Sequence, residues 1–171
     1  IQQYIFKVAG ALGGGSRGGG GGSGSTMGYS NLTNQQNPGV NNYLMTMLCA
    51  TDNFTINKIA FRAGGATPTT KYQPFVYQAT DAGIASSLLA TGPVVTGVTA
   101  GYNEAPLSAP LSLTKGQLVF IGVNPTVVGI SGLWTMNSVR GGFAGNGSST
   151  VPAPTSPGIS YGQPYGFWAV A

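Results

Sequence analysis

Short strand-like segments, each followed by turn residues, are the feature that most constrains how this chain can fold. Runs rich in β-branched and aromatic residues recur from Thr26 onward, and glycine, proline, asparagine or aspartate separates them. No window holds a convincing helical repeat of apolar residues over three turns, and the only helical candidate is Ala85–Leu89. Many short strands with turns of this kind predict an all-β sandwich or barrel.

The expected strands share a high content of valine, isoleucine, leucine and aromatic residues. They are Tyr43–Cys49, Phe54–Arg62, Gln73–Gln78, Val94–Thr99, Leu118–Val123, Leu133–Val139 and Tyr165–Val170, with a weaker one at Ala105–Leu111. The proline-rich stretch Asn146–Pro157 is expected to be a long surface loop, because proline cannot donate to a β-ladder. Tyr77, Trp134 and Trp168 lie inside expected strands, and we expect them in the core because aromatic side chains bury large areas.

Composition divides the chain into three zones. Residues 1–12 hold a β-branched and aromatic run that predicts an anchor strand with Tyr4, Phe6 and Val8 on one face. Residues 13–25 are almost entirely glycine and serine, a composition typical of a flexible linker, although glycine runs also occur where backbones pack closely. Residues 26–171 form the predicted β-sandwich domain.

Charge is scarce throughout the sequence. Charged residues make up 6% of the 171 residues, whereas 42% are apolar, so the chain lacks the low hydrophobicity of a disordered protein. Few charges mean little repulsion between copies, which suits a subunit that packs against its neighbours. The net charge is +4, but the bases form no run, so we expect no nucleic-acid binding. No apolar stretch is long enough to predict a membrane-spanning helix.

The sequence offers few groups for catalysis. It has no histidine, one cysteine and three acidic residues, Asp52, Asp81 and Glu104. Each acid stands beside turn residues, where solvation and local hydrogen bonds to the backbone are the usual role. Cys49 lies in an apolar run and is expected to be a buried small hydrophobe. We therefore expect no catalytic residue, no cofactor and no metal site, and a protein that is not an enzyme.

Two tyrosines in turn-like sequence, Tyr102 and Tyr161, are candidates for exposure. Exposed aromatic rings are a common feature of recognition surfaces. These two residues are therefore the candidate glycan contacts.

The middle of the chain resembles a known family. The segments that carry the likeness are Phe54–Arg62, Tyr72–Tyr77, Ser87–Gly92, Val94–Asn103 and Leu111–Val123. Their succession resembles the jelly-roll modules of bacteriophage tail and head appendage proteins, which include fibre and decoration proteins, and of some bacterial surface proteins. The resemblance implies a jelly-roll fold and no catalytic residues, and the family includes members that bind glycans.

Together these features predict a structural protein at a virion or extracellular surface. Its partners would be copies of itself and other virion or filament proteins. Tyr4, Ile5, Phe6 and Val8 would assemble the subunits by adding a strand to a neighbour's sheet. Two alternatives stay open: an extracellular, pilus-like filament subunit that polymerises by strand exchange, and a carbohydrate-binding adhesin module that binds a host surface glycan.

Overall fold

The computed structural model describes residues 26–28, 32, 34–38, 42–135, 142–146, 160–162 and 165–171, and every regular element among them is a β-strand. The expectation of an all-β fold is confirmed. For 42–43, 142–146 and 160–162 the description covers the backbone alone. No helix long and apolar enough to cross a membrane occurs in these ranges.

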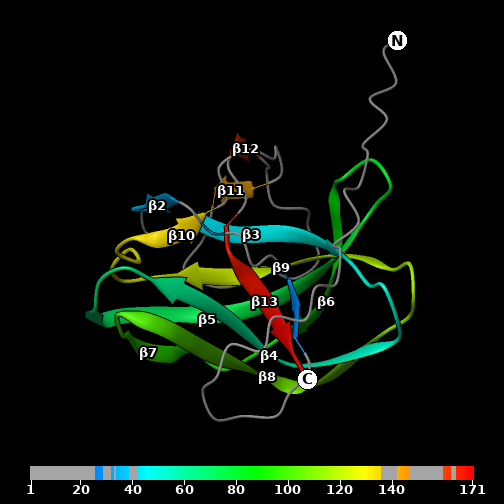
Figure 1. The fold of residues 1–171 in the computed structure, drawn as a ribbon, viewed down its shortest axis with the longest axis horizontal. Helices are drawn as coiled ribbons and strands as arrows, with labels where there is room; N and C mark the ends of the chain where they lie inside the picture. Colours follow the sequence, from blue (N-terminus) through cyan, green and yellow to red (C-terminus); the bar gives the residue numbers. More distant parts are fainter. Residues whose placement is uncertain are drawn as a thin grey trace.

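The strands form two antiparallel sheets that pack face to face as a sandwich (Figure 1). Their bounds are β1 Thr26–Gly28, β2 Asn34–Gln36, β3 Asn42–Cys49, β4 Phe54–Ala63, β5 Thr67–Ala79, β6 Ala85–Thr91, β7 Val95–Val98, β8 Gly101–Leu113, β9 Leu118–Pro125, β10 Leu133–Thr135, β11 Gly142–Asn146, β12 Ser160–Gly162 and β13 Phe167–Val170. Sheet A has the order β1-β13-β4-β10-β2, with β8 also paired to β4. Sheet B has the order β12-β11-β3-β9-β5-β6, with β7 also paired to β5.

The main core lies between the two sheets. Because side chains alternate along a strand, every second residue of the central strands points inward. The side chains of this core include Leu44, Leu48, Ile56, Ile59, Phe61, Tyr72, Val76, Leu113, Ile121, Leu133 and Phe167. The Phe61 ring lies edge-on to Tyr72 at 5.3 Å between ring centroids and to Phe167 at 6.0 Å. The contact between Phe61 and Tyr72 joins sheet A to sheet B, whereas Phe61 and Phe167 pack against each other within sheet A.

A second apolar cluster occupies the opposite face of sheet B. Met45, Phe75, Tyr77 and Phe120 alternate with the core residues of β3, β5 and β9, and all four are fully buried. Antiparallel sheets commonly leave one face exposed to water, but in this part of sheet B the side chains of both faces are buried. The prediction that Tyr77 is a core residue is confirmed.

Most expected strands are present, and one segment corrects the prediction. Ala85–Leu89, the helical candidate, lies in β6 and pairs with β5. The turn before it is a hairpin in which the Thr80 amide donates to the Ile84 carbonyl at 2.8 Å, with Gly83 at a φ of 73°. The weak strand expected at Ala105–Leu111 is the middle of β8, a long strand of 13 residues. Residues 1–12, 13–25 and 147–157, which carry the anchor, linker and loop predictions, lie outside the described residues.

Candidate interaction surfaces

The outer face of sheet A carries a group of aromatic and charged side chains, here called the aromatic face. It consists of Lys58 and Arg62 of β4, Tyr102 and Glu104 of β8, Trp134 of β10 and Trp168 of β13. Lys58 and Arg62 point outward because their neighbours in β4, namely Ile59, Phe61 and Ala63, face the core. The same alternation applies in β8, β10 and β13, where Ala105, Leu133 and Phe167 face the core. The strand register then sets Arg62 beside Tyr102, and sets Ala60 between Glu104 and Trp168.

Aromatic rings lie at both ends of this face. Tyr102 is 54% exposed, and its ring centroid lies 6.3 Å from that of Trp168. The Arg62 guanidinium carbon lies 4.8 Å from the centroid of the Trp134 ring, which is the geometry of a cation–π contact. Two indoles and one phenol therefore present ring surface on the same side of the sheet.

A carboxylate links the polar groups of the aromatic face. Glu104 accepts a hydrogen bond from the Tyr102 hydroxyl at 3.1 Å and forms an ion pair with the Lys58 ammonium at 2.7 Å. Partial burial, and then the bond to Glu104 and its negative charge, raise the pKa of Tyr102 to about 12. The expectation of a solvated turn position for Glu104 was wrong, because this residue lies within β8 and pairs across strands.

The two tryptophans also correct a prediction. Both were expected in the core, but Trp134 and Trp168 are only partly buried and lie on the outer face of sheet A. Trp168 lies across the neighbouring strand, where a Cβ built on Gly28 would meet the indole Cδ1 atom at 2.6 Å. The absence of a side chain at Gly28 gives the indole room against the sheet, an arrangement by which aromatic residues cover glycine in strands.

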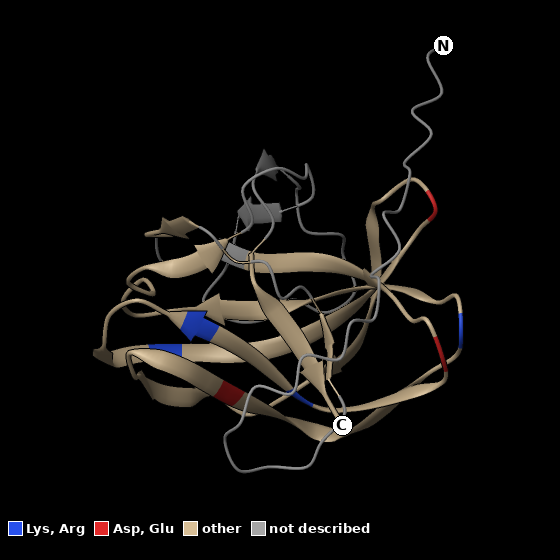
Figure 2. Ribbon diagram, in the orientation of Figure 1, with Lys and Arg blue, Asp and Glu red and all other residues tan. Residues whose placement is uncertain are grey.

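Charged groups are sparse elsewhere in the described residues, as Figure 2 shows. Asp52 and Asp81 are exposed in turns, in line with their expected role. No group of three histidine, cysteine, aspartate or glutamate side chains in this part of the chain could hold a metal ion. Cys49, expected to be buried, is half-buried at the end of β3.

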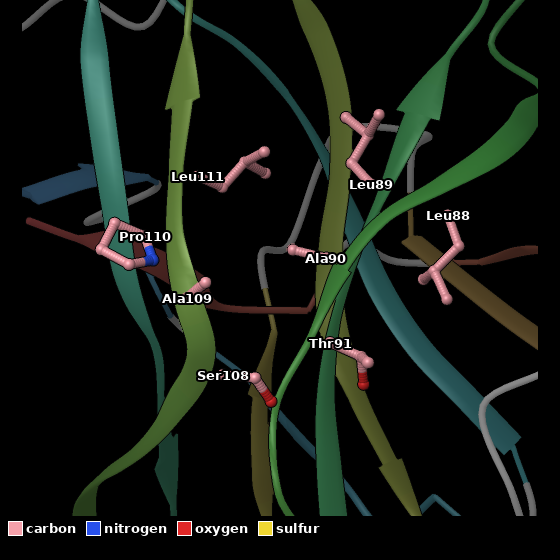
Figure 3. A pocket seen from close by; sticks show the side chains of 8 residues that line it. All are labelled: Leu88, Leu89, Ala90, Thr91, Ser108, Ala109, Pro110 and Leu111. Carbon is pink, nitrogen blue, oxygen red and sulfur yellow. The ribbon is translucent and has the colours of Figure 1, made fainter.

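An apolar groove lies where the open edges of the two sheets meet, and we call it the edge groove. It has a volume of about 340 Å³. Its lining comes from β6 and β8, namely Leu88, Leu89, Ala90, Thr91, Ser108, Ala109, Pro110 and Leu111 (Figure 3). Leu89, Ala90 and Leu111 also pack against the main core. The groove is therefore an exposed extension of the core between two edge strands.

An irregularity in β8 shapes this groove. Leu111 pairs with Ile56 and Pro106 pairs with Lys58, so the residues from Leu107 to Pro110 stand opposite the single residue Asn57. At the Pro106 end of this irregular stretch, a Cβ on Gly92 would lie 1.9 Å from the Pro106 carbonyl oxygen. β8 therefore touches the segment that follows β6. Bulges and prolines are features by which proteins protect an edge strand from uncontrolled pairing.

The structure separates the two candidate glycan contacts. Tyr102 is exposed in sheet A, whereas Tyr161 lies in β12 of sheet B, where it pairs with Phe143. The Tyr161 side chain is not described. The predicted assembly residues Tyr4, Ile5, Phe6 and Val8 lie outside the described residues.

Comparison of the chain with protein-family models, with curated proteins and with solved structures found no match. The resemblance to bacteriophage appendage modules therefore stays a prediction.

Proposed function

We propose that this chain is a non-enzymatic structural subunit of a virion, an appendage or decoration protein with a jelly-roll fold. The order of the strands is the observation that carries the proposal. Four strands of sheet A run β8-β4-β13-β1, and four of sheet B run β6-β5-β9-β3. The chain changes sheet at most connections, and its first and last described strands are neighbours. We take this order as support for a double-sheet jelly roll.

The described surface suits repeated packing of subunits. Only seven charged residues lie in the described ranges, namely Asp52, Lys58, Arg62, Lys71, Asp81, Glu104 and Lys115. Two of the seven already neutralise each other as the Lys58–Glu104 ion pair. A surface with so little charge opposes close approach of identical copies only weakly.

The edge groove is the acceptor that we propose for the N-terminal strand of a neighbouring copy. Among the described strands, β6 and β8 each pair along one edge only. An added strand would gain main-chain hydrogen bonds from the open edge of β6, since β8 is bulged where it lines the groove, and its alternate side chains would enter pockets. Tyr4, Phe6 and Val8 would be those side chains, and leucine and alanine line the groove that would receive them.

The predicted linker is long enough to reach the edge groove of its own subunit. Thr26 stands in one row of sheet A with Val170, Lys58 and Pro106. Three strand spacings of about 4.8 Å therefore place it roughly 14 Å from the groove side of β8. A glycine-rich linker spanning 13–25 has a root-mean-square reach of roughly 20 Å. The groove of the same subunit is within that reach, so tests must distinguish strand addition within one subunit from strand addition between subunits.

Deletion of residues 1–11 tests the proposed assembly. The full chain should form oligomers, and the deletion variant should be a soluble monomer, when both are measured by light scattering coupled to size-exclusion chromatography. A full-length variant with Tyr4→Ser and Phe6→Ser keeps the chain length and should also be monomeric. Unchanged assembly of both variants would remove the N-terminal strand from the account.

Electron microscopy of the native particle separates the virion from the filament. The chain located on a capsid or tail supports the virion subunit. An open helical fibre made of this chain alone supports the extracellular filament subunit, which uses the same strand addition.

A further inference from the structure

We propose that the aromatic face binds an acidic oligosaccharide, a function distinct from assembly at the edge groove. Tyr102 and Trp168 would stack on sugar rings, and Arg62 would pair with a sugar carboxylate. The proposal depends on described side chains only, so it does not require the N-terminal strand.

The rings supply an apolar surface with polar margins. Tyr102 is the most exposed aromatic residue of this face, and the Trp168 ring lies tilted beside it at 45°. The Glu104 carboxylate and the Lys58 ammonium stand at the margin of the phenol. A sugar ring has an apolar C–H face and a rim of hydroxyls, and this combination of ring surface and charged hydrogen-bonding groups matches both.

The charge balance of the face selects an acidic sugar. Lys58 is neutralised by Glu104, but Arg62 forms no ion pair with any carboxylate in the described part of the chain. Its guanidinium rests on Trp134, which holds the planar group in place. Arginine has five donors in a fixed arrangement that suits a carboxylate, so one positive charge is available to an anionic ligand.

The same features disfavour a protein partner. A stable protein interface buries about 800 Å² per partner and is depleted of charged residues at its centre. Here the ion pair of Lys58 and Glu104 lies beside Tyr102, and it would lose its solvation under a protein. A hydroxyl-rich ligand leaves those groups hydrated or hydrogen-bonded.

The two tryptophans provide a direct measurement, because Trp134 and Trp168 are the only tryptophans of the chain and both lie on this face. The assembled full-length protein is titrated with tetramers of galacturonate and of α2,8-linked sialic acid, and with neutral maltotetraose and cellotetraose. Binding should give a saturable change in tryptophan emission with an acidic tetramer and should weaken as salt is added. An array of sialylated, uronate-containing and neutral glycans extends the search to further acidic sugars.

Variants assign the binding to this face. Arg62→Gln should lower the affinity about tenfold or more, because it removes a charge-assisted hydrogen bond to the sugar carboxylate. Tyr102→Ala should also lower the affinity, because it removes the ring that stacks on the sugar. Lys71→Gln is the matched control, because it removes an exposed cation from β5 of sheet B, and its affinity should equal that of the wild type. All variants change exposed side chains, and their unfolding midpoints verify folding.

Three outcomes would overturn the proposal. They are the absence of any acidic glycan hit with the assembled protein, equal binding of acidic and neutral glycans, and affinity losses in Lys71→Gln as large as those in Arg62→Gln. Each can occur while the deletion of residues 1–11 still abolishes assembly, so failure here is distinguishable from failure of the proposed structural function.

Discussion

Phe61 of β4 and Tyr72 of β5 meet edge to face, with ring centroids 5.3 Å apart and ring planes at 86°. The two residues belong to different sheets, and both are almost completely buried. Their contact links the two layers of the sandwich.

Removal of the Phe61 ring should destabilise the fold strongly. Phe61→Ala is expected to lower the free energy of unfolding by about 3–5 kcal/mol, because it removes a large buried ring and leaves a cavity. Tyr72→Phe keeps the ring contact and should cost less than about 1 kcal/mol. Urea unfolding followed by fluorescence measures both. Equal losses in the two variants would mean that the aromatic contact does not hold the sheets together.

The contact between Gly92 and Pro106 gives a second prediction. Gly92→Ala places a methyl group against the Pro106 carbonyl, and overpacking of this kind costs about 1–3 kcal/mol. Gly65→Ala is the control, because its added carbon meets only the Ser131 side chain. Thermal unfolding should show the larger loss for Gly92→Ala. A Gly92→Ala variant as stable as the wild type would show that β8 can move away from β6.

The raised pKa of Tyr102 predicts a dependence on alkaline pH. Folding holds this pKa near 12, above the ordinary tyrosine value of about 10, so the folded state favours the protonated phenol. The resulting stabilisation is complete below pH 10 and is lost as the pH rises toward 12. Burial raises the pKa values of Tyr72 and Tyr165 as well, which adds to the loss.

Substitution of Glu104 separates the causes of the raised Tyr102 pKa. Glu104→Gln should lower the Tyr102 pKa without restoring its ordinary value, because burial is the larger cause. Phenolate absorbance during a pH titration, compared with Tyr102→Phe as the blank, measures the shift. A Tyr102 pKa that does not change in Glu104→Gln would contradict the hydrogen bond.

The Lys58–Glu104 ion pair should contribute little to stability. Its side chains are 46% and 34% exposed, and exposed pairs typically contribute about 0.2–1 kcal/mol. A double-mutant cycle with Lys58→Met and Glu104→Gln should give a coupling free energy in this range that falls with added salt. A coupling well above it, insensitive to salt, would mean that the pair is more deeply buried than its exposure indicates.

The positions of most strands could be predicted from the local sequence, because turn residues and β-branched runs act within a few positions of each other. Phe54–Ala63 and Leu118–Pro125 were predicted almost to their ends for this reason. β6 was not, because Ser86, Ser87, Leu88 and Leu89 lack a clear alternation of apolar and polar residues. Its pairing with β5, which includes shifts in register, decides its conformation.

The aromatic face could not be predicted, because its members come from four strands far apart in the sequence. Alternation places Lys58 with Arg62, and Tyr102 with Glu104, on one side of their own strands. Nothing local indicates that β4 pairs with β8 and β13, or that Trp168 faces outward while Phe167 faces the core. Both faces of β13 carry apolar residues, so alternation alone does not identify its core side.

Disulfide cross-linking between copies tests the central claim most directly, since Cys49 is the only native cysteine and Cys49→Ser gives a clean background. One protein carries Phe6→Cys and the other Leu111→Cys in the edge groove. Oxidation of the mixture should give a heterodimer whose linked peptides join positions 6 and 111. With Val127→Cys, an exposed position outside the groove, the yield should be low. Equal yields with Val127→Cys would contradict strand addition at the groove. A chain that carries both Phe6→Cys and Leu111→Cys and forms the disulfide only within itself would contradict strand addition between subunits.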